Sequence, residues 1–438
     1  MVTDSVRSDI ALLHRRLAFG ALPPDLDAAA AAGYDAAVSA LIGTLGAATP
    51  HADAVPRPTL TAAATLRAEK QAGAKGGGAR RNEAASIARW WIARMVSTEA
   101  PAQERLLWFW HGHFATSVRK VKAPSLVFAQ LDAERAASAG PFRDLAAAAI
   151  KCPAMLIWLD QAKSTKGHPN ENLAREALEL FTMGRNRGYA EDDVKAAARA
   201  LTGWTLDADV AFTVRPATHD PGPETLLART GSLTGDDLLD LATQHPSTAT
   251  HLAWKAWTAF AGPVAQDDSV VADVAKAFDG SGRRGDALLH AVVSHPRFRE
   301  PTVLDAIVRS PVEWLVLATR AVAQNFSDDA IAQAAAQALV GMGQVPFEPP
   351  SVGGWPEGAA WLTTGAQAAR LRFATVLATR ADLAWLKDVA PASRPGVLAL
   401  RLGRTAWGPS TAAVLATVAD RPVDLVTLAL VSPEAIVQ

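Results

Sequence analysis

Residues 168–181 read His168-Pro169-Asn170-Glu171-Asn172-Leu173-Ala174-Arg175-Glu176-Ala177-Leu178-Glu179-Leu180-Phe181, and this stretch decides the fold class. Its apolar residues recur at intervals of three and four, which is the spacing of one face of an α-helix. Asn170 is a good N-cap residue, and Glu171 lies in the first turn, where the helix dipole favours a negative charge. The stretch therefore predicts a capped amphipathic helix with its polar groups sorted onto one side.

The polar side of this helix has two interpretations. Glu171, Arg175 and Glu179 follow one another at four-residue spacing and would form a surface ion-pair ladder, worth a few tenths of a kcal/mol per pair. Periodicity alone favours this ladder. In the second interpretation Glu176 and Glu179, three residues apart, share a cation or a proton, and the polar side faces a site.

Composition extends the helical interpretation to the whole chain of 438 residues. Alanine, the best helix former, is abundant, and alternating apolar and polar residues are scarce. The 27 prolines and 30 glycines cut the chain into many short helices. We expect a mostly α fold, with many short helices in one compact multi-helical domain. The clearest strand candidate is 210–214, so we expect at most a small β hairpin near 210–220.

Charge and cysteine content exclude several classes of protein. The net charge of −1 and the pI of about 6.8 lack the basic footprint of a nucleic-acid binder. Cys152 is the single cysteine, so no internal disulfide can form. No apolar run reaches the roughly 18 residues needed to cross a bilayer. No signal peptide is evident at the N-terminus, so we expect a cytoplasmic protein without a membrane partner and leave export open.

A basic, glycine-rich segment at 69–83 lacks apolar anchors, and we expect a flexible loop there. An exposed insertion between helices is favoured over a tether or lid across a site.

Two histidines lie in an aromatic segment, 105–117. Positions two apart face nearly opposite sides of a continuous helix, so His111 and His113 can share one metal ion only if the helix breaks at Gly112. Carboxylates from elsewhere would then complete the metal site. The favoured alternative is a pair of buried histidines bonded to backbone or carboxylate groups among tryptophans.

Two further loops carry polar groups. His219 and Asp220 stand in a Pro-Gly-Pro turn, where they would supply a base or a ligand, or where Asp220 would cap the turn. The long segment 342–358 is rich in proline and glycine, which indicates an ordered rather than a floppy loop.

These motifs occur in one order along the chain, at residues 14–20, 110–117, 142–145, 153–156, 159–160, 170–184, 189–204, 219–223 and 342–355. The combination resembles the bacterial family catalogued as domain of unknown function 1800 (DUF1800). The resemblance implies a single, mostly helical family domain over residues 1–438 and no settled activity. It also implies a partner by association, a protein of the family called domain of unknown function 1501 (DUF1501), which is similar to alkaline-phosphatase-like enzymes. The chain departs from the family at Ala190, where Thr or Ser is usual, and at Gln161, where Asn is usual.

Because the polar groups lie in family motifs, we hypothesise that they converge in one pocket with tryptophan walls. Candidate catalytic residues are Glu176, Glu179, His219 and Asp220; candidate substrate-binding residues are Arg175, Asn172, Trp110 and Trp204; candidate ligands of a divalent metal are His111, His113 and Glu179. The reaction expected first is metal-assisted or acid–base hydrolysis of a polar or carbohydrate-like substrate. The alternative is a non-catalytic binding or assembly factor for the DUF1501 protein.

Overall fold

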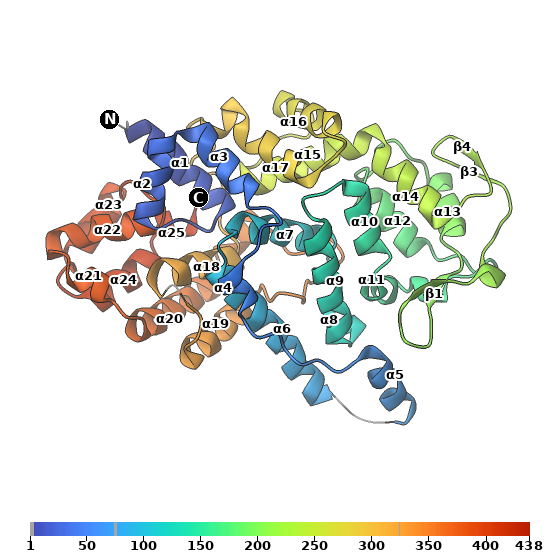
Figure 1. Ribbon diagram of the computed structural model, residues 1–438, viewed down its shortest axis with the longest axis horizontal. Coiled ribbons are helices and arrows are strands. Elements are labelled where there is room, and N and C mark those ends of the chain that lie inside the picture. The colour runs from blue at the N-terminus through green and yellow to red at the C-terminus, as the bar shows by residue number, and fades with distance from the viewer. Residues whose placement is uncertain (1–3, 74–76, 324) are drawn as a thin grey trace.

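The computed structural model describes residues 4–73, 77–323 and 325–438, and they are mostly α-helical (Figure 1). Ten helices of this part of the chain begin at a proline. Proline suits the first helical position because its missing N–H has no intrahelical partner there and its φ is already helical. The prolines therefore set the starts of many short helices, as the sequence predicts.

Buried apolar side chains form two core clusters. The first cluster is built mainly from helices α1 (Asp4–Leu17), α2 (Pro23–Ala32), α3 (Tyr34–Gly43), α10 (Phe142–Ile150), α11 (Pro153–Trp158), α12 (Glu171–Glu179), α13 (Glu191–Ala200), α14 (Gly235–Gln244), α15 (Pro246–Phe260), α16 (Ser269–Gly280) and α17 (Gly285–Ser294).

The second cluster is built mainly from α5 (Ala63–Gln71), α6 (Gly77–Ser97), α8 (Val118–Val121), α9 (Pro124–Ala137), α18 (Pro311–Val322), α19 (Asp329–Met342), α20 (Thr364–Arg380), α21 (Ala384–Lys387), α22 (Arg394–Arg401), α23 (Pro409–Ala416), α24 (Pro422–Leu430) and α25 (Pro433–Ile436). The short helix α4 (Pro50–Asp53) packs beside α6. Helix α7 (Pro101–His113) contributes to both clusters. Short 3₁₀ segments are η1 (Gln161–Lys163), η2 (Pro216–Thr218), η3 (Pro296–Arg299), η4 (Gly358–Trp361) and η5 (Pro391–Ser393).

The β structure consists of two small antiparallel hairpins in the described residues. Strand β1 (Trp204–Leu206) pairs with β2 (Phe212–Val214), which confirms the predicted hairpin. Strand β3 (Glu224–Leu226) pairs with β4 (Arg229–Gly231) in a second hairpin that the sequence did not predict. Its turn places Leu227 and Ala228 at φ of 49° and 67°, a conformation usually signalled by Asn or Gly.

The predicted flexible loop at 69–83 is wrong over most of its length. Residues 69–71 end α5, and residues 77–83 form the first turns of α6, which starts at Gly77. Residues 74–76 lie outside the described residues. The helix extends to this end because Ala79, Arg80 and Arg81 are good helix formers and adding a residue to an existing helix is easier than starting one.

Helix α2, near the start of the chain, packs against α22, near its end, blue against red in Figure 1. Within the described ranges, no helix has the length and apolar character needed to span a membrane.

Candidate functional site

Helix α12 forms as predicted, with the Asn170 side chain accepting a hydrogen bond from Asn172 N (3.0 Å). Its polar side is an ion-pair ladder. The Arg175 guanidinium lies 3.1 Å from the Glu171 carboxylate and 3.5 Å from that of Glu179, and it also pairs with Glu191 at 2.5 Å. The ladder interpretation of Glu171, Arg175 and Glu179 is therefore the one observed, and α13 extends it.

Glu176 lies beside this ladder and has a different environment. Burial first, and then the charge of Glu179, raise the pKa of the Glu176 carboxyl. The Glu179 side chain is only 12% exposed and also pairs with Arg185 (3.2 Å). Both Glu179 oxygens therefore have arginine partners. Glu176 is the carboxyl group of this pair that has no ion pair with an arginine in the described structure.

Two buried histidines bind the C-terminal end of α12. His113 Nε2 donates to the carbonyl oxygen of Phe181 (3.0 Å), and His251 Nε2 lies 3.4 Å from that of Leu180. Burial lowers the pKa of His113 well below its ordinary value and that of His251 to about 4, so both rings are neutral. They satisfy carbonyls that have no partner within the helix.

His111 lies in different surroundings. Its Nε2 accepts a hydrogen bond from Phe347 N (3.2 Å), and its ring contacts Trp91, Trp108 and Trp355. Burial lowers the pKa of His111 to about 3. The structure thus agrees with the alternative of buried histidines bonded to the backbone among aromatic rings.

The predicted metal ligands His111, His113 and Glu179 are not brought together. Helix α7 continues through Gly112 to His113, so the two rings keep the opposite directions of a continuous helix. Across the described ranges, no three His, Cys, Asp or Glu residues form a group that could hold a metal ion. The close approach at Gly112 has another use, since Gly354 packs against its carbonyl, where a Cβ would lie only 2.7 Å away.

His219 and Asp220 form a turn cap. His219 Nδ1 lies 3.0 Å from the carbonyl oxygen of Thr202, and Asp220 binds Arg199 Nε (2.9 Å) and accepts from Gly222 N (3.0 Å). The hydrogen bond from Arg199 lowers the pKa of Asp220 below its ordinary value.

This turn is distant from the histidines on α7. Thr218 accepts from Lys166 N, in the loop that leads into α12, so the turn lies toward the start of that helix. The histidines lie at its end, and nine residues span about 13 Å. The structure therefore does not unite these predicted site residues in one pocket.

The predicted substrate-binding residues are also dispersed. Trp110 is fully buried and donates to the Ser138 carbonyl (3.1 Å). Trp204 is 2% exposed and packs so closely on Gly235 that a Cβ there would lie 2.3 Å from its ring. Asn172 is exposed to solvent. Both tryptophans are core side chains rather than pocket walls.

A cleft of about 730 Å³ lies elsewhere, between the first helices of the chain and α18 and α22. It is lined by α1, the α1–α2 loop, α2, α3, α4 and the junction of α6 with α7, and its charged or titratable lining residues are His14, Asp25, His51, Glu99, Arg320 and Arg401. It is large enough for a small-molecule ligand.

His14 lies in the last turn of α1 and is 9% exposed. Its Nδ1 is buried and has no hydrogen-bond partner among the described residues, which leaves Nε2 as the nitrogen that can face the cleft. Burial lowers the pKa of His14 to about 4 against the opposing field of Asp25, so the ring is neutral at physiological pH. A neutral imidazole can accept a proton.

The chain after His14 is held in a tight turn. Ala18 N and Gly20 N both donate to the carbonyl oxygen of His14 (2.9 and 3.0 Å). Gly20 has φ of +86°, and a Cβ there would lie 2.7 Å from Leu317 of α18. Glycine is therefore needed both for the turn and for the close packing that forms this side of the cleft.

Two guanidinium groups of cleft-lining residues are held by backbone carbonyls. Arg320 Nη1 donates to the carbonyls at the end of α6, at Met95 (3.1 Å), Val96 (2.8 Å) and Thr98 (3.2 Å). Burial lowers the pKa of Arg320 to about 10, while Asp25 and Glu99 act in the opposite direction, so it stays cationic. Arg401 donates to the Ala321 carbonyl (2.9 Å) and stacks on Trp385.

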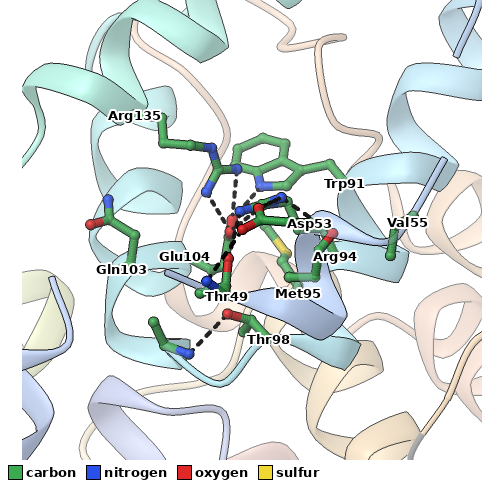
Figure 2. A network of polar contacts seen from close by, with 12 residues as sticks. Thr49, Asp53, Val55, Trp91, Arg94, Met95, Thr98, Gln103, Glu104 and Arg135 are labelled. Carbon is green, nitrogen blue, oxygen red and sulfur yellow. Dashed lines mark hydrogen bonds and ion pairs between the residues drawn. The ribbon is translucent and has the colours of Figure 1, made fainter. Parts of the chain in front are cut away.

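A buried network holds the wall made by α4 and the α6–α7 junction (Figure 2). Glu104 of α7 is 1% exposed and accepts from Trp91 Nε1 (2.8 Å), Arg94 Nε (3.0 Å) and Arg135 Nη2 (3.0 Å). Arg94 also pairs with Asp53 of α4 (2.8 Å). One carboxylate thus fixes α4, α6 and α9 relative to α7.

Comparison with known families assigns the chain. Residues 12–437 match the family model "Protein of unknown function (DUF1800)". The chain belongs to the DUF1800 family. No curated protein and no solved structure matches it. The predicted family membership is confirmed for nearly the whole DUF1800 chain, and the match brings no activity with it.

The cleft residues of this DUF1800 protein were missed as site residues, although one signal was present. His14 and Gly20 stand in the 14–20 motif that carried the family resemblance, and that motif contributes His14, Ala18, Phe19 and Gly20 to the cleft. Arg320 and Arg401 have no local signal, because they reach the cleft only through packing of helices distant in sequence.

Proposed function

We propose that this DUF1800 protein is a hydrolase that acts by acid–base chemistry on a small, polar, anionic substrate held in the cleft. The observation that carries the proposal is that one cleft combines a neutral, buried histidine with two oriented guanidinium groups. A cleft with convergent polar groups and a shifted histidine pKa is the usual setting of an active site. Carbohydrate-like substrates that bear a carboxylate, phosphate or sulfate group fit this description.

Each cleft residue has a role in the proposal. Arg320 and Arg401 bind the anionic group of the substrate, since both remain charged and are held by backbone carbonyls. His14 accepts a proton from the attacking water and returns it to the leaving group. The negative charges of the substrate and of Asp25 stabilise the imidazolium that forms, so substrate binding raises the pKa of His14 toward neutrality.

The proposal takes the acid–base rather than the metal-assisted branch, because no three-residue ligand group is found in the described parts of the chain. Elemental analysis of the purified protein tests this choice. Suppose that the protein binds stoichiometric divalent metal and that both His113→Ala and Glu179→Ala lose it with the fold intact. The active site would then be a metal site between α7 and α12, not the cleft.

Activity is tested with p-nitrophenyl phosphate, p-nitrophenyl sulfate and p-nitrophenyl glucuronide as probes, with the neutral p-nitrophenyl glucoside for comparison. We expect release of p-nitrophenol from an anionic probe in preference to the glucoside. His14→Asn should lower kcat by about 10²- to 10⁴-fold, the usual contribution of a general base. Arg401→Met should act mainly on KM.

The matched control is His290→Asn, since His290 is an exposed histidine on α17. Circular dichroism of each variant establishes that the fold is kept. Full activity in His14→Asn would reject the cleft as the active site. A loss of activity in Glu176→Gln as large as the loss expected for His14→Asn would also reject it.

A second candidate function is a non-catalytic binding or assembly factor for a DUF1501 protein. Exposed apolar side chains favour it, since Val340 of α19 is 68% exposed, Leu362 beside η4 is 52% exposed and Leu371 of α20 is 44% exposed. Co-purification with a DUF1501 protein, abolished by Val340→Asp with Leu371→Asp but unaffected by His14→Asn, would favour this candidate over the hydrolase.

A further inference from the structure

The cleft is lined by a second histidine, His51, on the one-turn helix α4. Its Nδ1 lies 2.5 Å from Oε1 of Glu99, which also lines the cleft, and its backbone N–H donates to the same oxygen (2.8 Å). The His51 side chain is 82% exposed. The carboxylate occupies the Nδ1 side of the ring, so Nε2, on the other side, is the nitrogen left for a ligand.

Arg94 of α6 fixes the short helix that carries His51 (Figure 2). Its guanidinium pairs with Asp53 (2.8 Å) and donates to Thr49 Oγ1 (3.0 Å). These two residues lie on either side of His51 in the chain. The imidazole is therefore held twice, through the backbone of its own helix and through Glu99.

The junction of α6 and α7 ties His51 to one of the two arginines of the proposed substrate site. Arg320 Nη1 donates to the carbonyl oxygen of Thr98 (3.2 Å), and Glu99 is the next residue in the chain. The charge of Glu99 also favours the cationic form of Arg320. Two consecutive residues thus bind the guanidinium and the imidazole, which places both groups on one stretch of the cleft wall.

A single acid–base group restricts the substrates of the proposed hydrolase. Return of the proton by His14 suffices for a phenolate, because a phenolate leaves as a stable anion and can be protonated afterwards. An alkoxide must receive a proton while it leaves. His14 is then still accepting the proton of the attacking water, so a second donor is needed.

We propose that His51, oriented by Glu99, is this second proton donor and extends the substrates of the cleft to esters and glycosides of unactivated alcohols. The inference rests on the proposed function and adds a residue and a substrate class to it. The water oxygen bonds to the reacting atom, and one water proton passes to His14. The bond to the leaving oxygen breaks with its electron pair on that oxygen, which takes the proton of His51 Nε2. Solvent then reprotonates His51 and removes the proton from His14.

The surroundings of the two histidines suit these opposite roles. His14 is 9% exposed and neutral, which suits a base. The Glu99 carboxylate beside His51 stabilises an imidazolium, the form that donates a proton. Burial opposes the charge of Glu99, but hydrogen bonds from the backbone N–H groups of His51 and of Glu99 itself, together with the His51 ring, hold the pKa of Glu99 below its ordinary value. Contrasting environments for two titratable groups are typical of an acid and base pair.

The test compares two leaving groups on the same anionic group. The pairs are p-nitrophenyl phosphate with glycerol 2-phosphate, p-nitrophenyl sulfate with methyl sulfate, and p-nitrophenyl glucuronide with methyl glucuronide. His51→Asn keeps a hydrogen-bond donor for Glu99 near the position of Nδ1 but removes Nε2. It should lower kcat by about 10²- to 10⁴-fold for the alkyl member of a hydrolysed pair and by less than about tenfold for the p-nitrophenyl member.

Glu99 is a positioning residue in this proposal. Glu99→Gln should lower kcat selectively for the alkyl substrate, by a smaller factor than His51→Asn, because the ring keeps its nitrogens but loses its orientation. A merely structural role would lower kcat for both leaving groups alike. His290→Asn, which changes an exposed histidine of α17, should leave both rates unchanged.

Two results would overturn this inference and leave the proposed function standing. One is an equal loss on both leaving groups in His51→Asn, and the other is wild-type hydrolysis of a p-nitrophenyl substrate without hydrolysis of any alkyl substrate. If the wild-type protein hydrolyses no member of any pair, the proposed function fails, and this inference fails with it.

Discussion

Glu224 shows at the scale of one residue how burial without a partner becomes pH dependence. Its side chain is 2% exposed, neither carboxyl oxygen has a hydrogen-bond partner in the described structure, and Arg199 Nη1 lies 3.6 Å away. Burial raises the pKa of Glu224 to about 7 against the field of Arg199. The folded state thus keeps a proton that the unfolded chain loses near the ordinary glutamate pKa.

The sign of the effect on stability follows from this difference. A raised carboxyl pKa stabilises the fold below the unfolded pKa, and the stabilisation is lost as pH rises to about 7. We expect Glu224 to lower the free energy of unfolding by roughly 2 kcal/mol between pH 4.5 and 7.5. Urea unfolding of Glu224→Gln should show a flatter pH profile over this range. The exposed Glu300→Gln serves as the control, and an identical slope in both variants would contradict the assignment.

At the scale of the element, two neighbouring helix starts make opposite predictions. Asn170 caps α12 through its side chain, so Asn170→Ala should cost about 1 kcal/mol of unfolding free energy. At α13 only Asp193 contributes, accepting from Ala190 N (2.8 Å), because alanine has no side-chain acceptor. Ala190→Thr would complete that capping box and should add about 0.5–1 kcal/mol. Urea unfolding at one pH measures the change in unfolding free energy of each variant. Changes in the same direction for Asn170→Ala and Ala190→Thr would contradict the capping argument.

Elements whose signals are local could be predicted from the sequence. Helix α12 depends on its own cap and periodicity, and the first hairpin on a short apolar run, and both were confirmed. The second hairpin could not be predicted, because Leu227 and Ala228 carry no turn signal. Asp193 of α13 holds the Leu227 amide instead (2.7 Å), and that contact exists only after the chain has packed.

The candidate site could not be predicted for the same reason, because it forms only when helices distant in sequence pack together. The cleft joins His14 to Arg320 and Arg401, and no periodicity connects residues so far apart in sequence. The polar side of α12 attracted attention because its charges are sorted, yet sorted charges on an exposed face are satisfied by each other, as Arg175 is by three carboxylates. Groups without a partner, such as His14 Nδ1, become visible only in the folded molecule.

At the scale of the whole molecule, α7 joins the two core clusters. Leu106 and Trp110 belong to one cluster, and Leu107 and Trp108 belong to the other. Opposite faces of one continuous helix are therefore buried in different cores, so neither cluster can lose its packing without exposing part of α7. Glu104 on the same helix links α6, α9 and, through Arg94, α4.

This arrangement predicts a single cooperative unfolding transition that depends on Glu104. Glu104→Gln leaves the guanidinium groups of Arg94 and Arg135, 12% and 18% exposed, without their buried carboxylate, and should cost about 3–5 kcal/mol. Asp132→Asn breaks the exposed Arg57–Asp132 pair on α9 and should cost less than about 1 kcal/mol. Differential scanning calorimetry should show one peak in every variant, shifted strongly only by Glu104→Gln. Two separate peaks would mean that the two clusters unfold independently and that α7 does not couple them. Equal shifts in the two variants would contradict the role assigned to the buried Glu104 network.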